Sequence, residues 1–198
     1  METLPEIIGL AGTNGAGKDT LGDLRYETQG ARKVSLSDIL RHEADKRELS
    51  HTRENLSNIS REWGSLMGAG ALSLMTLRNF TETRTETESG ISIVSIRRPA
   101  EAEAIQEAGG VILWVDADRR LRYQRILHAN RGRVDDMVSY EVFCEQEDRE
   151  MVPASDDPAA LNMAGVRDRA DIHLINEFAS EEKYRRYLST RFGLKRSR

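Results

Sequence analysis

The sequence is poor in cysteine and contains no long apolar run. Its one cysteine, Cys144, rules out an internal disulfide framework and fits a reducing compartment such as the cytoplasm. The apolar runs, of which Val111–Val115 is typical, have the length of a strand and fall far short of a membrane span. No secretory signal is recognisable in the first residues. These absences predict a cytoplasmic protein that does not enter a membrane.

An excess of positive charge is also absent. Lys and Arg number 29 against 33 Asp and Glu, which gives a net charge of −4 at pH 7. Because nucleic-acid-binding surfaces are usually basic, this balance argues against a nucleic acid as the main partner. The four histidines show no metal-ligand spacing. We expect a monomer or homodimer that acts on small molecules, with its 198 residues forming one domain.

One stretch near the start of the sequence carries a specific pattern. An apolar run of strand length at 7–11 is followed by three glycines and a lysine, and then by an amphipathic run at 21–26. Glycines let backbone N–H groups converge on an anion, while a helix N-terminus and a lysine add positive charge. The stretch therefore predicts a nucleoside triphosphate site. The residues expected to form it are Gly12, Asn14, Gly15, Ala16, Gly17, Lys18, Asp19 and Thr20.

The cation that accompanies a triphosphate is expected in the same stretch. The usual pattern has Ser or Thr directly after the lysine, whereas here Asp19 takes that place and Thr20 follows it. Mg²⁺ prefers oxygen ligands and keeps several waters, so Thr20, and Asp19 through water, would hold it. Asp19 fits equally well as a favourable acid in a first helical turn. ATP and Mg²⁺ are the cofactors that we predict.

Five short apolar runs alternate with helical patterns. This alternation predicts a parallel sheet with helices on both faces, a three-layer α/β/α architecture. Ligands of such sheets bind at the carboxyl ends of the strands. The predicted strands are 7–11, 32–36, 91–96, 111–115 and 172–175.

The boundaries of several helices are marked by residue type. We expect Ser37, Thr52, Ser139 and Ser180 to begin helices, and Pro99 to occupy a first helical position. The Thr- and Glu-rich segment 81–89 contains no apolar residue, so it is predicted to be an exposed, mobile connection.

Several motifs together resemble a known family. The segments 12–20, 35–41 and 131–136 follow in the order of the phosphate loop, monophosphate-binding segment and arginine-bearing lid of adenylate-kinase-like nucleoside monophosphate kinases. Residues 93–136 look still more like the dephospho-CoA-kinase-like predicted kinases of archaea and small bacteria, and residues 171–176 resemble that group's late strand near the adenine. The Gly-Lys-Asp-Thr spelling is similar to phage-type deoxynucleoside monophosphate kinases.

This resemblance implies a P-loop kinase fold and several roles. It implies one kinase domain over 1–198, an acceptor-binding helical segment at about 37–80 and a short lid at about 129–137. Lys18 would bridge the β- and γ-phosphates. Arg125, Arg131 and Arg133 would close over the phosphates, and Asn176 would lie near the adenine.

The acceptor side is expected to depend on three residues. Arg41 lies one turn into the helix after the second strand, where its guanidinium fork could hold a phosphate, and Arg97 directly follows the third strand. Each also fits as a surface arginine. Asp38 could take the proton of a hydroxyl acceptor, or simply complement a helix dipole.

One feature departs from the family pattern. The third strand of such kinases typically ends with an acid that helps to hold the metal, but here it reads Ile93-Val94-Ser95-Ile96, and Asp116 after the fourth strand could substitute. We predict an ATP-dependent phosphotransferase acting on a (deoxy)nucleoside monophosphate. The alternatives are a dephospho-CoA kinase-like enzyme that phosphorylates a hydroxyl, and a non-catalytic nucleotide-binding regulator.

Overall fold

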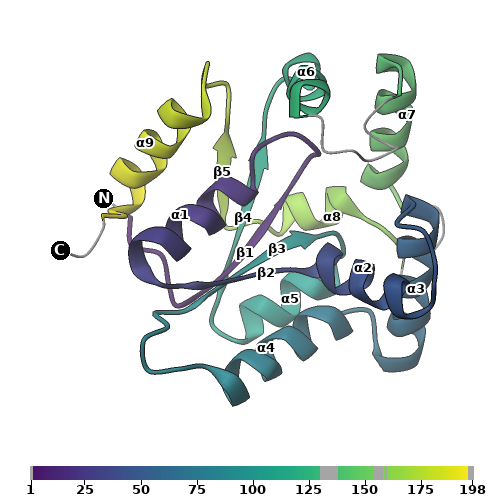
Figure 1. Cartoon of the computed structure of the whole chain (residues 1–198), viewed down its shortest axis with the longest axis horizontal. Helices are drawn as coiled ribbons and strands as arrows, with labels where there is room; N and C mark the ends of the chain where they lie inside the picture. The colour runs from purple at the N-terminus through teal and green to yellow at the C-terminus, as the bar shows by residue number, and fades with distance from the viewer. Residues whose placement is uncertain (1, 130–137, 154–157, 159, 196–198) are drawn as a thin grey trace.

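The computed structural model describes residues 2–129, 138–153, 158 and 160–195. Its centre is a five-stranded parallel sheet with the strand order β2-β3-β1-β4-β5. Helices cover both faces of this sheet (Figure 1), so the predicted three-layer α/β/α class is confirmed. The strands are β1 (Ile7–Gly12), β2 (Arg32–Ser35), β3 (Ile91–Ile96), β4 (Val111–Asp116) and β5 (Ile172–Ile175).

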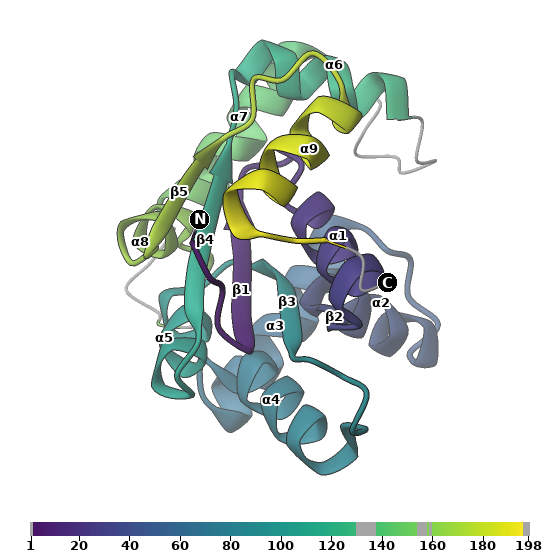
Figure 2. The same cartoon turned by 90° about the vertical axis from the view of Figure 1, so that its left-hand side faces the viewer.

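One face of the sheet is covered by α1 (Asp19–Gln29) and α9 (Glu181–Phe192), which lie side by side in Figures 1 and 2. Ile8 and Leu10 of β1 point to this face and are fully buried. Strand residues alternate between faces, so every second side chain of β1 joins this layer. The helix residues that they pack with include Leu21, Leu24, Tyr184, Leu188 and Phe192.

The opposite face carries five helices and the larger of the two hydrophobic clusters. Ala11 and Trp114 of the sheet belong to it. Three of these helices occupy most of the segment predicted to bind the acceptor. The helices are α2 (Leu36–Lys46), α3 (Arg53–Met67), α4 (Ala71–Thr83), α5 (Pro99–Glu107) and α8 (Met163–Asp168). Their buried residues include Leu36, Leu40, Ile59, Leu72, Phe80, Ile105 and Val166.

Two further helices, α6 (Arg119–Ala129) and α7 (Tyr140–Met151), lie beyond the carboxyl ends of the central strands (Figure 1). They pack through aromatic rings, with the centroids of Tyr123 and Phe143 5.5 Å apart. The predicted lid residues 130–137 fall between these helices and lie outside the described residues. In the described part of the chain, no helix combines the length and apolarity that crossing a bilayer requires.

Strand β3 contains a bulge close to its carboxyl end. Leu10 of β1 pairs with Val94 but Ala11 pairs with Ile96, so Ser95 is an extra residue on β3. The φ angle of Ser95 is +69°, in the left-handed region that is unfavourable for residues other than glycine. The bulge also explains why Ile96 packs on the same face as Ile93. This strained residue lies within the stretch 93–96, which contains no acid.

Most of the predicted helix starts are confirmed. Thr52, Ser139 and Ser180 each accept a hydrogen bond from the third backbone N–H of the helix that follows. The prediction for Ser37 is wrong, because Ser35 makes this bond to the N–H of Asp38 at 3.3 Å. Helix α2 therefore begins at Leu36, which the hydrophobic core buries.

The predicted connection at 81–89 is shorter in the structure. Helix α4 continues to Thr83, and the hydroxyls of Thr81 and Thr83 donate to carbonyls four residues earlier at 3.0 and 2.7 Å. The residues that follow are mostly exposed, as predicted, but Glu88 forms an ion pair with Arg32 of β2 at 2.6 Å. The connection is thus tied to the edge of the sheet.

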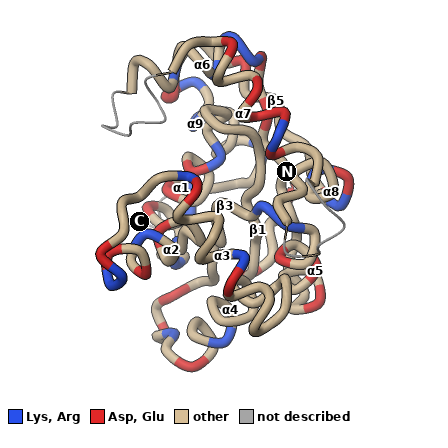
Figure 3. Tube along the Cα trace, turned by 90° about the vertical axis from the view of Figure 1, so that its right-hand side faces the viewer, with Lys and Arg blue, Asp and Glu red and all other residues tan. Residues whose placement is uncertain are grey.

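Charged residues of both signs are spread over the surface. Basic and acidic segments alternate along the trace in Figure 3, and many form ion pairs, such as Arg47 with Glu62 at 2.7 Å. Exposed pairs of this kind contribute little to stability, typically about 0–1 kcal/mol. The charged residues that matter for chemistry are those at the carboxyl ends of the strands.

Candidate functional site

The loop between β1 and α1 has the geometry of an anion cradle. Gly15 and Gly17 have φ angles of +79° and +85°. A Cβ atom on Gly15 would lie 2.6 Å from the carbonyl oxygen of Arg122, and one on Gly17 would lie 2.6 Å from Nδ2 of Asn176. Both positions therefore require glycine for conformation and for space.

The N-terminus of α1 adds to this cradle. Helices α2, α3, α7 and α9 each begin with a hydroxyl side chain that caps a backbone N–H group, whereas α1 begins at Lys18 without a side-chain cap. The first N–H groups of a helix have no partner within the helix and attract anions. The loop and the helix start therefore fit a polyphosphate.

Two residues from other strands hold the loop in place. Thr13 donates its hydroxyl to Oδ1 of Asp116 at 2.7 Å. Asn176, which follows β5, donates Nδ2 to the carbonyl of Ala16 at 2.8 Å. The sequence analysis expected Asn176 near an adenine, and here its side chain braces the loop itself. Its buried Oδ1 has no hydrogen-bond partner among the described residues.

Helix α6 supports the loop from behind. Arg122 is 3% exposed and donates to the carbonyls of Asn14 at 3.2 Å and Ala117 at 2.8 Å. Its guanidinium also forms a two-pronged ion pair with Glu147 of α7, one prong of which measures 2.8 Å. No motif of the sequence identified Arg122 or Glu147. The two buried charges neutralise each other, and Arg122 holds the backbone of Asn14 in place.

The residues predicted to hold Mg²⁺ differ in their surroundings. Thr20 is buried in the first turn of α1. The Asp19 carboxylate is half-exposed and lies 3.4 Å from Nζ of Lys33. Among the residues that the structure describes, no group of three or more His, Cys, Asp or Glu side chains could hold a metal ion. The magnesium roles of Thr20, and of Asp19 through water, stay predictions.

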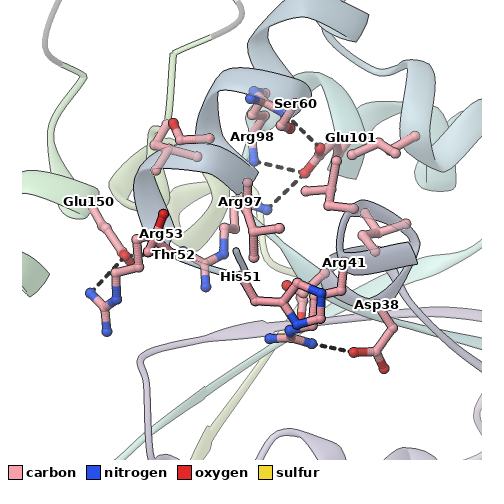
Figure 4. A pocket seen from close by; sticks show the side chains of 18 of the residues that line it. Asp38, Arg41, His51, Thr52, Arg53, Ser60, Arg97, Arg98, Glu101 and Glu150 are labelled. Carbon is pink, nitrogen blue, oxygen red and sulfur yellow. Dashed lines mark hydrogen bonds and ion pairs between the residues drawn. The ribbon is translucent and has the colours of Figure 1, made fainter. Parts of the chain in front are cut away.

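A cavity of about 530 Å³ lies beside the loop, in the size range of small-molecule sites. Its walls come from α2, α3 and the carboxyl end of β3, and Asn14 of the loop reaches it (Figure 4). The lining combines leucines with hydroxyl and charged side chains. The apolar lining residues are Leu36, Leu40, Leu56, Leu72 and Leu161, and the hydroxyl residues are Ser37, Ser50, Thr52, Ser57, Ser60 and Ser95.

Four arginines line this cavity, of which Arg98 is almost fully buried and the other three are partly exposed beside carboxylates. Arg41 pairs with Asp38 on its own helix. Arg53 and Arg97 both lie 3.1 Å from the same oxygen, Oε1 of Glu150. In Figure 4, Asp38 and Arg41 form one group and Arg53 and Glu150 another, with Arg97 lying between them. The cavity therefore presents several guanidinium groups close to the loop, a side chain that suits anions.

The position of Arg97 follows from the start of α5. Glu101 accepts hydrogen bonds from the backbone N–H groups of Arg97 at 2.8 Å and Arg98 at 3.2 Å. Arg98 is 2% exposed and donates to Ser60 of α3 at 2.6 Å and to Glu101 at 3.1 Å. This buried network fixes the backbone after β3 and leaves the Arg97 side chain in the cavity.

The predicted site residues divide into three groups. The first surrounds the cavity, namely Asn14, Asp38, Arg41 and Arg97. The second lies behind the loop, where Arg125 donates to the carbonyl of Phe178 at 3.0 Å and burial lowers its pKa. The third, Arg131 and Arg133, lies outside the described residues.

The sequence analysis missed Arg53 and Glu150. The Thr52 cap, which it did identify, places Arg53 in the first turn of α3. Nothing near Glu150 in the sequence indicated its role, since it reaches the site only through the packing of α7.

Comparisons with known proteins agree with the fold. No protein-family model matches the chain. A UPF0200 protein of Thermococcus gammatolerans is 29% identical over 188 residues, which cover 93% of this chain and 92% of that protein, and its name states no activity.

Solved structures give the same picture. TT1252 from Thermus thermophilus superposes with a TM-score of 0.56 at 16% identity and covers 95% of this chain and 97% of that chain. A shikimate kinase from Acinetobacter baumannii in complex with shikimate gives a TM-score of 0.55 at 15% identity, covering 94% and 92%. At such identities the likeness concerns the fold, which is that of P-loop kinases.

Proposed function

We propose that this protein transfers the γ-phosphoryl group of ATP to a (deoxy)nucleoside monophosphate. The observation that carries the proposal is the contact between two phosphate-binding arrangements. A glycine cradle at the start of α1 adjoins a cavity that Arg41, Arg53 and Arg97 line. Phosphoryl transfer needs the donor and the acceptor to be held close together while their charges are neutralised.

On the donor side, the cradle residues would hold the triphosphate through backbone N–H groups and Lys18. Lys18 would neutralise charge between the β- and γ-phosphates, and the Thr20 hydroxyl would hold Mg²⁺ in the first turn of α1. A magnesium ion held there would supply neutralisation of the phosphate charge. Arg125 and Asn176 remain predicted contacts of the nucleotide, and Arg131 and Arg133 remain predicted lid residues.

On the acceptor side, the mixed lining of the cavity suits a nucleotide. Arg41 and Arg97 would hold the phosphate of the acceptor, which arrives already ionised and needs no base. The leucines and hydroxyl groups of the lining would contact a sugar and a base. The fold leaves the acceptor open, because a structure with the same fold is that of a shikimate kinase.

The nearest alternative is a kinase for a hydroxyl acceptor, with Asp38 as the base. Asp38 lines the cavity, but its side chain is 68% exposed and pairs with Arg41. A base held at the water-exposed rim is poorly placed to exclude solvent from the reaction. These surroundings favour a charge-balancing role for Asp38.

The first test measures ADP release from ATP and Mg²⁺ with a panel of acceptors. The panel contains nucleoside monophosphates, deoxynucleoside monophosphates and dephospho-CoA, and the Lys18→Ala variant provides the blank. Turnover with at least one monophosphate is expected, and Lys18→Ala should lower kcat by roughly 10²–10³-fold, as loss of one charge-stabilising donor does. Turnover with dephospho-CoA alone would overturn the proposal, and ATP binding without turnover would indicate a regulator.

The Asp38→Asn variant separates the two kinase types. For a monophosphate kinase we expect kcat to change less than about threefold, because an exposed ion pair contributes about 0–1 kcal/mol. For a hydroxyl kinase, loss of the general base would lower kcat by roughly 10²–10⁴-fold. Steady-state rates with the preferred acceptor of the panel make the decision.

A further inference from the structure

Glu150 occupies an unusual position for a carboxylate, between phosphate-binding side chains. It stands near the end of α7, and its Oε1 atom lies 3.1 Å from Nη1 of Arg53 and 3.1 Å from Nη1 of Arg97. Figure 4 shows its side chain directed at Arg53 at the edge of the cavity. Three segments far apart in the sequence therefore meet at one oxygen atom.

The charge of Glu150 is stabilised where it stands. Burial alone would raise the pKa of this carboxyl, but the charges of Arg97 and Arg53, with a smaller effect of Lys18, hold the pKa below its ordinary value. Glu150 is therefore ionised at neutral pH. The phosphate loop, through Lys18, contributes to the same electrostatic environment as the arginines of the cavity.

This ion pair differs from the buried pair beside it. Arg98 and Glu101 have side-chain exposures of 3% and 2%, and they also bond to Ser60 and to backbone groups. Arg97, Arg53 and Glu150 have side-chain exposures of 38%, 32% and 19% and all line the cavity. Both groups border the cavity, but the Arg98–Glu101 pair is almost fully buried, so the second group is far more accessible to an anion that enters.

A carboxylate and a phosphate compete for the same donors. Both accept charge-assisted hydrogen bonds from guanidinium groups, but a phosphate offers more oxygens and a larger charge. A phosphate that binds Nη1 of Arg97 competes with the Glu150 carboxylate, whose Oε1 lies 3.1 Å from that nitrogen. An acceptor without a negative charge cannot replace the carboxylate as an ion-pair partner of the arginines.

We propose that Glu150 is a resident counter-ion that holds Arg53 and Arg97 until the phosphate of the acceptor displaces it. Glu150 is thereby a specificity-determining residue, because it favours acceptors that carry a phosphate over neutral ones. Arg53 is a further phosphate-binding residue of the acceptor. This inference rests on the proposed function for its acceptor, but it concerns anion binding and can be tested without turnover.

The test measures the binding of inorganic phosphate to the full-length protein by isothermal titration calorimetry at constant ionic strength. Glu150→Gln removes the competing charge and keeps the shape, so the Kd for phosphate should fall roughly tenfold, equivalent to about 1.4 kcal/mol. Glu150→Asp draws the carboxylate back by one methylene and should give a smaller gain. Thermal unfolding of each variant verifies that it is folded.

Two controls locate the effect. Glu145→Gln removes a carboxylate from the same helix, where it pairs with Arg149 at the surface at 3.5 Å, and it should leave the Kd unchanged. The proposed phosphate loop would also bind anions, so Glu150→Gln is also introduced into the Arg53→Ala/Arg97→Ala background, where it should give no gain. A gain that persists without both arginines would assign it to another anion site and overturn the inference.

The outcomes separate this inference from the proposed function. If Glu150→Gln binds phosphate more tightly but no monophosphate is turned over, the counter-ion role stands and the proposed acceptor fails. If a monophosphate is turned over but both Glu150 variants bind phosphate no better than the unaltered protein, the counter-ion role is wrong.

Discussion

The glycine loop before α1 and the neighbouring cavity use their charged residues in opposite ways. Behind the phosphate loop, Arg122 and Glu147 are almost fully buried and bond to each other and to the backbone of Asn14. In the neighbouring cavity, Arg53, Arg97 and Glu150 remain partly exposed. The first set of charges fixes the backbone, whereas the second faces the space where a ligand would enter.

The difference follows from what holds the anion in each region. A loop that binds an anion through backbone N–H groups depends on the conformation of its backbone. The charges behind the loop therefore serve to keep that conformation. Arginine side chains are attractive to any nearby carboxylate, so without a ligand they pair with one. We therefore expect the charges behind the loop to affect stability and those in the cavity to affect ligand binding.

The largest effect is predicted for the buried pair behind the loop. Arg122→Met leaves Glu147 buried without its two-pronged partner, which should lower the free energy of unfolding by about 3 kcal/mol. This is the lower end of the usual range for breaking a buried pair, because Arg119 stays 3.1 Å from Glu147. Chemical denaturation measures the change.

A second variant tests whether the unpaired charge of Glu147 causes the loss of stability in Arg122→Met. Arg122→Met/Glu147→Leu removes both charges and should recover most of the lost stability. A double variant no more stable than Arg122→Met would show that the bonds of Arg122 to Asn14 and Ala117, and not its charge, carry the effect.

The phosphate loop was predictable from the sequence because its function resides in consecutive residues. Three glycines and a lysine between a strand and a helix specify both the turn and the cradle. The residues behind it were not predictable, since Arg122 and Glu147 are separated by 25 positions and meet only when α6 packs on α7. Tertiary packing also explains the correction at Ser35. Leu36 is buried in the core as the first residue of α2, so the helix begins earlier in the sequence than predicted.

A smaller effect is predicted for the glycines of the loop. Gly17→Ala and Gly109→Ala both place a side chain at a positive φ angle, of +85° and +80°, at a cost of about 1–2 kcal/mol of stability. The added Cβ at Gly109 meets nothing within 4 Å, while that at Gly17 meets Asn176. Only Gly17→Ala should therefore weaken ATP binding, at least about tenfold in Kd.

Calorimetric titration with ATP and thermal unfolding of the same samples give both numbers. Equal ATP affinities of the two alanine variants would mean that backbone strain, and not crowding of the cradle, governs the loop. Loss of ATP binding in both would point to a general loss of structure.

The acceptor cavity was only partly predictable. Arg97 was identified because it directly follows β3, and Arg41 because it lies in the helix that follows β2, at the carboxyl edge of a parallel sheet where ligands bind. Arg53 and Glu150 follow no such rule. The bulge at Ser95 was also beyond prediction, because a serine in the left-handed region is specified by its neighbours in the fold and not by its own preference.

The most local effect is predicted for Arg41, and it concerns the acceptor alone. Arg41→Ala removes one charge-assisted contact to the acceptor phosphate, so its affinity should fall by about 1.5–3 kcal/mol, while ATP affinity and stability stay unchanged. Arg78→Ala is the matched control, because Arg78 also pairs with a carboxylate on its own helix but lies 81% exposed on α4, away from the cavity. Titration of both variants with the preferred monophosphate and with ATP provides the comparison. A similar loss of ATP binding in Arg41→Ala would mean that the two regions are one continuous site, because charge in the cavity would then act on the loop as well.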